Sequence, residues 1–449
     1  MRQMNLVGYS IRTKGVGNFA RRLWTVFARF GIGERQTRDD LLTILNTVKN
    51  YGGAPTFFIP AVVLGRHGSL IDEIHHGGAE IGIHGYVHND FRSLSESRQY
   101  QQTKMAIDVF RGIPIPFHGF RNPYLGWNED SVSMFTRLGF MYDSNEAVVH
   151  DVLDLTRYSE TLRDGFERSL SLFQAIECNA YTLRPHFEGA LLRIPTSIPD
   201  DEMLYDRMRM TDQKELGALW SNVMRRVYDL GGIYVLNLHP ERGRLCQPAL
   251  DILLKSASSQ PLPVWVTHLQ QVAEWWQERS HFTLTLTPLG PSRWRLDAQC
   301  SSRATILGRH VTVEDAQTSA WQGTDVVIEA TQCTVSSALR PCIGLSPDTS
   351  DDVASFLHEQ GYIAVRAPNA EATEFACYLT MSNGLGEQRE EQRKRRSALI
   401  EQIETLDVPL IRFACWPSRH RAALSITGDI DSITVQDFFL RILETRKYA

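Results

Sequence analysis

The chain has 449 residues, of which 43% are apolar and 22% are charged. These proportions are typical of a globular protein with a sizeable buried core, and the length suggests two or three domains at about 150 residues each. The formal net charge is −5, and this balance lacks the basic face that nucleic-acid binding requires. We therefore expect no nucleic-acid partner.

The N-terminal sequence and the cysteines indicate the compartment. MRQMNLVGYSIRTKG lacks the apolar core of a signal peptide, and no apolar run reaches the ~18 residues of a membrane span. The seven cysteines are scattered, odd in number and form no CxxC pair, which is typical of reduced thiols. We expect a cytoplasmic protein without a transmembrane span, and the sequence leaves its oligomeric state open.

Residues 1–280 alternate between strand and helix patterns. Apolar side chains at i, i+3 and i+4 mark the helices, and short apolar runs mark the strands. The expected strands are 5–11, 55–64, 80–84, 118–121, 140–142, 191–195 and 233–238, and the expected helices are 17–31, 37–51, 70–76, 93–110, 129–138, 214–230 and 267–279. Such alternation predicts a parallel α/β sheet or barrel, with the chemistry at the C-terminal ends of the strands.

The composition changes after Ser280. HFTLTLTPLGPSRWRLDAQ alternates apolar and polar residues, which favours a half-buried antiparallel sheet. Residues 341–415 return to an α/β pattern, and EQREEQRK (387–394) opens a highly charged helix that we interpret as a solvated face. The last stretch, 422–449, predicts a strand, an acidic turn and a helix, like one more unit of the first part.

Two histidines stand where a metal site is expected. His84 and His88 follow the predicted strand GAEIGI, and rings at i and i+4 reach the same side if the segment is helical or turn-like. Paired histidines at this spacing are a known route to a metal. The spacing alone is unspecific, because histidines also cluster without function. We interpret the nearby His75 and His76 as an exposed helix end.

Five segments carry a resemblance to a known family. In chain order they are APTFFI (54–59), AEIGIH (79–84) with His88, FRNPY (120–124), FMYDS (140–144) and LNLHP (236–240). They resemble the ATFF, HEIGxHTxxH, RxPY, YDS and LxLH motifs of the polysaccharide deacetylase family (the NodB-homology domain, carbohydrate esterase family 4). The resemblance covers 1–280 and 420–449, whereas 283–415 matches no family that we recognise.

The acidic first motif of that family is absent from its expected place. The N-terminal strand NLVGYSI has no carboxylate, and we interpret Asp39 and Asp40 as structural residues at a helix start. The motif's D-x-D form instead resembles ALSITGDID, at 423–431. This segment is either the stump of a second copy or the first strand of a circularly permuted fold. Permutation explains with one assumption why the N-terminal part lacks the acidic motif and why the C-terminal segment has that motif without the others. We therefore adopt it.

The resemblance implies an α/β fold: a deformed (β/α) barrel of the polysaccharide deacetylase type, circularly permuted, with an inserted α+β accessory domain. We expect the barrel at 1–280, the accessory domain, of unknown role, at 283–415, and the first strand and helix of the barrel at 420–449. The implied activity is hydrolytic removal of acetyl from an N-acetylated sugar, whether a polysaccharide or a lipid-linked or nucleotide-linked precursor. The alternatives are hydrolysis of another C–N bond, as in allantoinase-like relatives, and a catalytically silent carbohydrate-binding protein.

The resemblance also implies a metal site. His84, His88 and Asp431 are the expected ligands, Asp429 is the expected general base, and Arg121 is expected to orient Asp429 through a charge-assisted pair. Two histidines and one carboxylate leave open positions on one divalent metal, as catalysis requires. Such mixed ligands suit zinc, with cobalt, nickel or iron as alternatives. Because carboxylates two apart on a strand face opposite sides, the chain must turn between Asp429 and Asp431.

Two further roles follow from the resemblance. The backbone N–H of Tyr124 is expected to contribute to an oxyanion hole. His239 is expected to be the general acid for the leaving amine, with an unperturbed pKa near 6.5 that suits this task.

Other residues have two interpretations each. Tyr124 and Trp127 are core or sugar-stacking aromatics, and Asp143 forms a turn or supports the site from behind. Asp200 and Asp201 line the site or cap a helix. Asn237 departs from the family pattern, because an apolar residue commonly lines the acetyl pocket at that position; Leu236 and Leu238 are the candidates to replace it.

Overall fold

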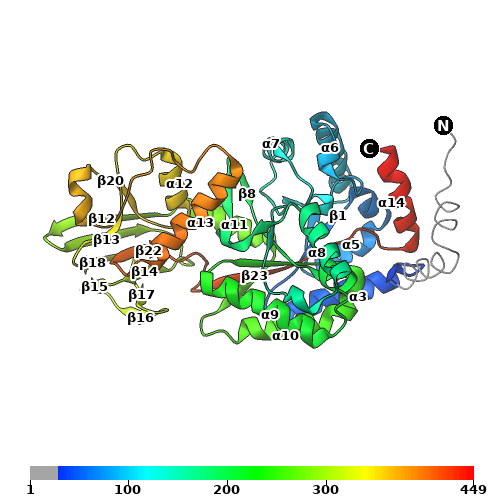
Figure 1. Ribbon diagram of the computed structural model, residues 1–449, viewed down its shortest axis with the longest axis horizontal. Helices are drawn as coiled ribbons and strands as arrows, with labels where there is room; N and C mark the ends of the chain where they lie inside the picture. The colour runs from blue at the N-terminus through cyan, green and yellow to red at the C-terminus, as the bar shows by residue number, and fades with distance from the viewer. Residues whose placement is uncertain (1–28, 449) are drawn as a thin grey trace.

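The computed structural model describes residues 29–448. A mostly parallel sheet surrounded by helices occupies one end of the molecule, and the sheets of residues 283–413 occupy the other (Figure 1). The strand expected at 5–11, and most of the helix expected at 17–31, lie outside the described residues. Among residues 29–448 no helix is both long enough and apolar enough to cross a membrane.

The main sheet has 12 strands, which pair in parallel except for β7 with β8. In chain order the strands are β1 (Thr56–Ile59), β2 (Glu80–Ile83), β3 (Gly119–Phe120), β4 (Tyr142–Asp143), β5 (Ala147–Val149), β6 (Ile176–Glu177), β7 (His186–Glu188), β8 (Leu191–Arg193), β9 (Thr196–Ile198), β10 (Ile233–Leu238), β11 (Val264–Val266) and β23 (Ala422–Asp429). Parallel strands buried on both faces read as short apolar runs, which is why the sequence predicts most of them.

The sheet curls back on itself. Strand β8 pairs with β4, whereas β9, only two residues further along the chain, pairs with β5 and β10. The short loop between β8 and β9 therefore connects strands near opposite ends of the strand order. This curled sheet confirms the α/β class that the sequence predicts.

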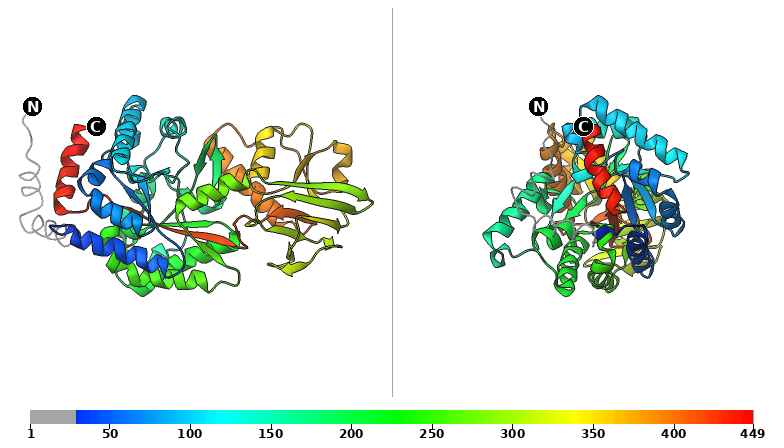
Figure 2. Two further views of the ribbon diagram at one scale, coloured as in Figure 1. Left: turned by 180° about the vertical axis from the view of Figure 1, so that it is seen from behind. Right: turned by 90° about the vertical axis from the view of Figure 1, so that its right-hand side faces the viewer.

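Helices surround this sheet (Figure 2). They are α3 (Arg35–Lys49), α4 (Ala61–Arg66), α5 (Gly68–His76), α6 (Glu96–Gly112), α7 (Glu129–Arg137), α8 (Glu160–Leu172), α9 (Gln213–Leu230), α10 (Gly243–Ser258), α11 (Leu269–Arg279) and α14 (Val435–Lys447). Helix α9 ends as the sequence predicts, at Gly231 with φ 65°, a left-handed conformation that glycine adopts without strain. Helices α8 and α10 were not among the expected elements, and α10 contains a proline, Pro248.

The strand expected at 55–64 is wrong in its second half. Strand β1 ends at Ile59, Pro60 follows, and residues 61–66 form helix α4. The side chains on both sides of Pro60 are apolar and buried, so burial alone does not separate strand from helix here. Proline lacks the N–H that would continue the ladder, and it is tolerated at a helix start.

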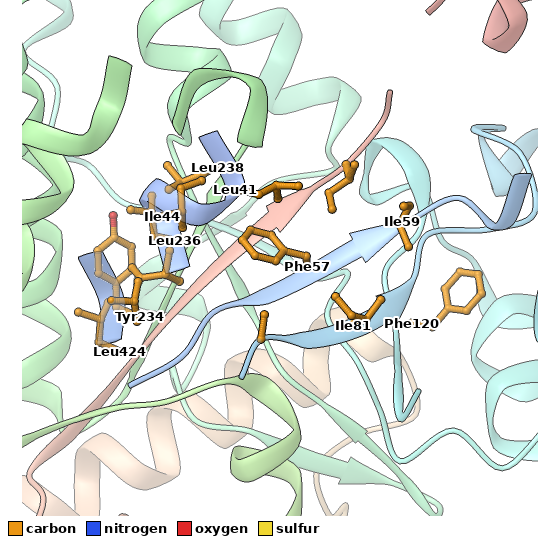
Figure 3. Close-up of a cluster of buried hydrophobic side chains, with 14 of the residues drawn as sticks. Leu41, Ile44, Phe57, Ile59, Ile81, Phe120, Tyr234, Leu236, Leu238 and Leu424 are labelled. Carbon is orange, nitrogen blue, oxygen red and sulfur yellow. The ribbon is translucent and has the colours of Figure 1, made fainter. Parts of the chain in front are cut away.

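Strand β23 lies in the middle of the main sheet. It pairs in parallel with β1 and with β10, with Thr427 opposite both Thr56 and Asn237. All eight of its residues are buried. Leu424 lies in the same apolar cluster as Phe57 of β1 (Figure 3). The C-terminal strand is therefore an interior part of the sheet that begins near the N-terminus.

Residues 283–413 form three smaller sheets. Their strands are β12 (Thr283–Gly290), β13 (Arg293–Gln299), β14 (Ile306–Arg309), β15 (Thr312–Val313), β16 (Thr318–Ala320), β17 (Asp325–Ile328), β18 (Gln332–Ser336), β19 (Arg340–Leu345), β20 (Ala364–Arg366), β21 (Phe375–Leu379) and β22 (Leu410–Phe413). Strands β12 and β13 are antiparallel, and β19, helix α12 (Asp351–Glu359) and β20 form a parallel unit, as the sequence predicts. The domain boundaries at 280, 283, 415 and 420 stay a prediction.

The burial of β23 generates a stability prediction. Ile426 is fully buried between β1 and β10, so Ile426→Ala is expected to lower the free energy of unfolding by about 2–5 kcal/mol. Leu443→Ala on helix α14 is the matched control, because Leu443 is 62% exposed and its loss is expected to cost less than about 0.5 kcal/mol. Urea unfolding measures both. Equal effects of the two substitutions would contradict an interior position for β23.

Candidate active site

His84, His88 and Asp431 converge, as the sequence predicts. Strand β2 ends at Ile83, and the chain turns at Gly85, whose φ is +83°. The ring centroids of the two histidines lie 5.3 Å apart. Asp431 Oδ1 lies 3.6 Å from Nε2 of His84 and 3.1 Å from Nε2 of His88. Two imidazoles and a carboxylate from opposite ends of the chain thus face one point.

The donor atoms of this cluster fit a divalent cation. His84 donates its Nδ1–H to the backbone carbonyl of Arg121 at 2.8 Å, which leaves Nε2 free to bind a metal. Burial lowers the pKa of His84 to about 4, so the ring is neutral at physiological pH, as a ligand must be. Asp431 Oδ1 is buried, and no residue of 29–448 forms a hydrogen bond with it. A cation would satisfy this atom.

The other oxygen of Asp431 is held by Arg441. Nη1 of Arg441, on helix α14, donates to Oδ2 at 2.7 Å. Burial raises the pKa of Asp431, but the adjacent imidazole of His88 and the guanidinium of Arg441 outweigh burial and hold that pKa well below its usual range. No sequence motif marks Arg441, and only the packing of α14 reveals its role.

Asp429 is the last residue of β23, so the chain leaves the strand before Asp431, as the sequence requires. Arg121 Nη1 lies 3.3 Å from Asp429 Oδ1, which confirms the expected pair. Asn237 is a partner that the sequence did not identify. Its Nδ2 donates to Asp429 Oδ2 at 2.9 Å, and its Oδ1 accepts from Arg121 Nη1 at 2.7 Å. The residue that departs from the family pattern therefore bridges the acid and the arginine.

Arg121 is fully buried and has many partners. Its guanidinium carbon lies 4.4 Å from the ring centroid of Phe58. Its other hydrogen bonds go to the backbone oxygen and Oγ of Ser144, Oγ1 of Thr196 and Oγ1 of Thr427. These contacts leave the guanidinium one orientation, directed at Asp429.

Tyr124 lies in a strained turn beside the histidines. The short helical turn Pro123–Leu125 contains two consecutive residues with positive φ, Tyr124 at 59° and Leu125 at 52°. The Asn122 side chain spans the turn by donating to the carbonyl of Gly126 at 2.8 Å. The Tyr124 ring is 43% exposed, and its centroid lies 4.6 Å from that of His88. Such strain persists only where the surroundings impose it, often at functional sites.

The expectation of an unperturbed His239 is wrong. The ring Nδ1 donates to Asp201 Oδ1 at 2.7 Å, and Asp201 is fully buried. Burial lowers the pKa of His239, but the Asp201 charge and hydrogen bond outweigh burial and raise that pKa well above 6.5. Asp200, the other acid of the pair, accepts from the backbone N–H of Met203 at 2.8 Å and lines the pocket. Asp200 therefore both lines the pocket and caps the helical segment that follows, the two roles that the sequence left open for these acids.

One pocket is lined by most of these groups, but not by Arg121, Asp201 or Arg441. It is lined by His84, His88, Tyr124, Leu125, Ser169, Leu172, Phe173, Asp200, Glu202, Met203, Arg207, Asn237, His239, Asp429 and Asp431. Besides these acids and histidines, its lining includes apolar side chains from the end of helix α8 and from the segment after β9. The pocket therefore offers a polar reaction centre beside a small apolar surface.

Other predicted residues lie outside this pocket. Asp143 Oδ1 forms an ion pair with Arg193 Nε at 2.6 Å and supports the site from behind. The faces of the Trp127 ring are covered by guanidinium groups, which favours the core interpretation over sugar stacking. Asp40 accepts from the backbone N–H of Arg244 at 3.0 Å, a structural role as expected.

The sequence of this region matches a known family. Residues 30–142 match the family model described as polysaccharide deacetylase. This part of the chain is therefore similar to polysaccharide deacetylases, and we refer to the α/β part of the chain that contains it as the deacetylase domain. A peptidoglycan deacetylase-like protein of Gibberella zeae is 31% identical over 125 residues. That match covers 27% of this chain and 34% of the relative, so it spans about a third of the relative's length.

Two solved structures illustrate what this chain is similar to. One is a polysaccharide deacetylase structure from Mycobacterium smegmatis, with 22% identity and a TM-score of 0.41 over 52% of this chain and 76% of the other. The second is an allantoinase, with 18% identity and a TM-score of 0.41 over 53% of this chain and 72% of the other.

The Asp201–His239 pair generates a titration prediction. Replacing Asp201 by Asn removes the charge that raises the His239 pKa. We therefore expect the His239 ring to have a lower pKa in Asp201→Asn than in the wild type. In the wild type, the stabilisation from this pair is present below pH ~6.5 and is lost as pH rises through the raised folded-state pKa. NMR titration of the His239 ring measures the shift. An equal or higher pKa in the variant would contradict the assignment.

Proposed function

We propose that the deacetylase domain is a metal-dependent hydrolase that removes acetyl groups from an N-acetylated sugar. The observation that carries the proposal is the approach of Asp431 to His84 and His88, with a second carboxylate, Asp429, on the same pocket. Two histidines and one carboxylate form the ligand set of a catalytic site, because they leave positions open for water and substrate. Zinc suits these ligands best, with cobalt, nickel and iron as alternatives.

The residues around the pocket supply the remaining steps. When bound, the metal supplies Lewis acidity and lowers the pKa of water toward about 7. Asp429 takes the proton as water adds to the amide carbonyl carbon, while Arg121 and Asn237 hold its carboxylate in place. The Tyr124 N–H stabilises the oxyanion. The C–N bond then breaks as protonated His239 donates a proton to the amine, which leaves acetate and a free amino sugar.

The raised pKa of His239 supports its role as the acid. A histidine with an ordinary pKa is mostly neutral at pH 7, whereas the Asp201 hydrogen bond keeps His239 protonated in that range. The same bond fixes the ring so that Nε2 faces the pocket. The apolar side chains of Leu125, Leu172 and Met203 provide a surface for the acetyl methyl group.

We further propose that the domain is circularly permuted relative to its family. The family model matches from residue 30, and the acidic segment 423–431 lies nearly 300 residues after that match ends at residue 142. The pairing of β23 with β1 supports permutation, because the acidic strand comes directly before the ATFF strand in the family's motif order and here lies next to it in the sheet. The stump of a second copy would not need to pair inside the first sheet.

Metal analysis tests the ligand assignment. We expect one metal per wild-type chain by elemental mass spectrometry, and loss of that metal in Asp431→Ala. Asp108→Ala is the matched control, because Asp108 is an exposed acid on helix α6 and its removal is expected to leave the metal bound. Unchanged metal content in Asp431→Ala would contradict both the ligand set and the role of the C-terminal strand.

Acetate release tests the reaction. We expect the metal-loaded protein to release acetate from N-acetylglucosamine oligomers or from nucleotide-linked N-acetylated sugars, and Asp429→Asn to abolish release while the metal stays bound. A wild-type protein that binds metal but releases no acetate from any of these substrates would refute the deacetylase proposal.

Asn237 offers a sharper test of the site. Replacing it with Leu removes the hydrogen bonds to Asp429 and Arg121, and a hydrogen bond to a charged group contributes about 1.5–3 kcal/mol. We expect Asn237→Leu to lower kcat about 10- to 100-fold with the metal retained. Leu236→Met, a volume-conserving change at the neighbouring position, is the control. Full activity in Asn237→Leu would show that the amide does not position Asp429.

A further inference from the structure

We propose that helix α13 (Arg389–Thr405), which lies in residues 283–413, holds the active site of the deacetylase domain in its working geometry through Arg393 and Glu146. The inference rests on the proposed function and assigns a task to a segment that the family resemblance does not cover. In this view Arg393 is a positioning residue, because it touches neither the metal ligands nor the pocket.

The outer contact is a charge pair between two distant segments. Arg393 Nε donates to Glu146 Oε1 at 2.9 Å, and Glu146 is 2% exposed. Tyr181 donates its hydroxyl to the other Glu146 oxygen at 2.7 Å. One helical turn earlier on α13, Arg389 pairs with Glu188 of β7. The sequence predicts a solvated face for this charged helix, and this part of the expectation is wrong because two of its arginines reach the main sheet.

These arginines complete a buried charge cluster. Arg193, fully buried, forms ion pairs with Asp143 at 2.6 Å and Glu188 at 2.7 Å. The guanidinium carbons of Arg193, Arg389 and Arg393 lie 4.4, 5.1 and 5.6 Å from the Trp127 ring centroid. An aromatic face near several cations adds favourable electrostatics.

Helix α13 supplies two of the three cations of this cluster. Three guanidinium groups face the carboxylates of Asp143, Glu146 and Glu188, and Arg389 also pairs with the exposed Glu129. Without Arg389 and Arg393, Arg193 alone would face all three acids. Unpaired buried carboxylates are costly, so the backbone that carries them would shift or admit water. The geometry of segment 143–146 therefore depends on a helix almost 250 residues away.

The same segment holds Arg121, which positions Asp429. Ser144 and Asn145 lie between the two acids of the cluster. Ser144 accepts from Arg121 Nε through its backbone oxygen at 3.0 Å and from Nη2 through Oγ at 2.9 Å. Asn145 accepts the backbone N–H of Asn122 at 2.7 Å, directly before the strained turn at Tyr124. A shift of this segment would therefore move both Arg121 and the proposed oxyanion donor.

The kinetic test compares adjacent residues of α13. We expect Arg393→Ala to lower kcat roughly 10- to 100-fold, the cost of a small misplacement of catalytic groups, with KM and metal content within about two-fold of wild type. Lys394→Ala is the matched control, because Lys394 is solvent-exposed and its ion pair among residues 29–448 is with Glu390 on the same helix. Arg393→Lys, which retains the charge, is expected to restore part of the rate.

A second measurement does not depend on turnover. By hydrogen–deuterium exchange we expect roughly ten-fold faster exchange in peptides covering 119–126 and 142–149 of Arg393→Ala than of Lys394→Ala, with unchanged exchange at 80–88. General loosening of the fold would instead raise exchange in all three regions and lower the metal content.

The kinetic and the exchange measurements together distinguish failure of the proposed function from failure of the inference about helix α13. If the wild type releases no acetate, the proposed function fails, but the exchange arm still decides whether α13 holds the Arg121 segment. If exchange at 119–126 in Arg393→Ala equals that of the control, this inference is overturned whatever the activity. Loss of metal in Arg393→Ala in parallel with kcat would also overturn it, because the effect would then act on the ligands.

Discussion

The parallel pairing of β23 between β1 and β10 is the constraint on which the site depends. Hydrogen bonds in register bring Asp429 to the C-terminal edge of the sheet, next to Asn237 on one side and close to the histidines that follow β2 on the other. Without this strand, the remaining sheet would have the two histidines but not Asp431, the proposed acidic ligand. The proposed metal site therefore depends on two distant parts of the chain that meet in one sheet.

Burial of charge shapes the chemistry of the site. Asp429 lies in a nearly dry environment and is held by Arg121 and Asn237, whereas Asp201 uses its charge to raise the pKa of His239. These two buried acids thus serve different purposes because their partners differ. Fixed partners of this kind preorganise a site, since the polar groups need no rearrangement when charge develops.

Buried charges with fixed partners also link the two ends of the molecule. Helix α13 supplies Arg389 and Arg393, two of the three cations that face Asp143, Glu146 and Glu188. A segment without any recognised motif thereby becomes part of the environment of Arg121. Buried ion pairs are poor sources of net stability, but the removal of one partner leaves a charge that the surrounding backbone must accommodate.

Local sequence determined a large part of this protein. The apolar runs and helix periodicity gave most elements of the main sheet, and the motifs around His84, Arg121 and His239 identified the site, because each is a short pattern that lies at a strand end. Pro60 shows the limit of such patterns, since an apolar run that spans a strand and a helix reads as one element. Only the tertiary structure decided that Asn237 bridges Asp429 and Arg121, that Arg441 holds Asp431, and that Asp201 raises the pKa of His239. These are contacts between side chains 10 to 192 positions apart, and their distances and burial follow from how strands and helices pack, which no local pattern encodes.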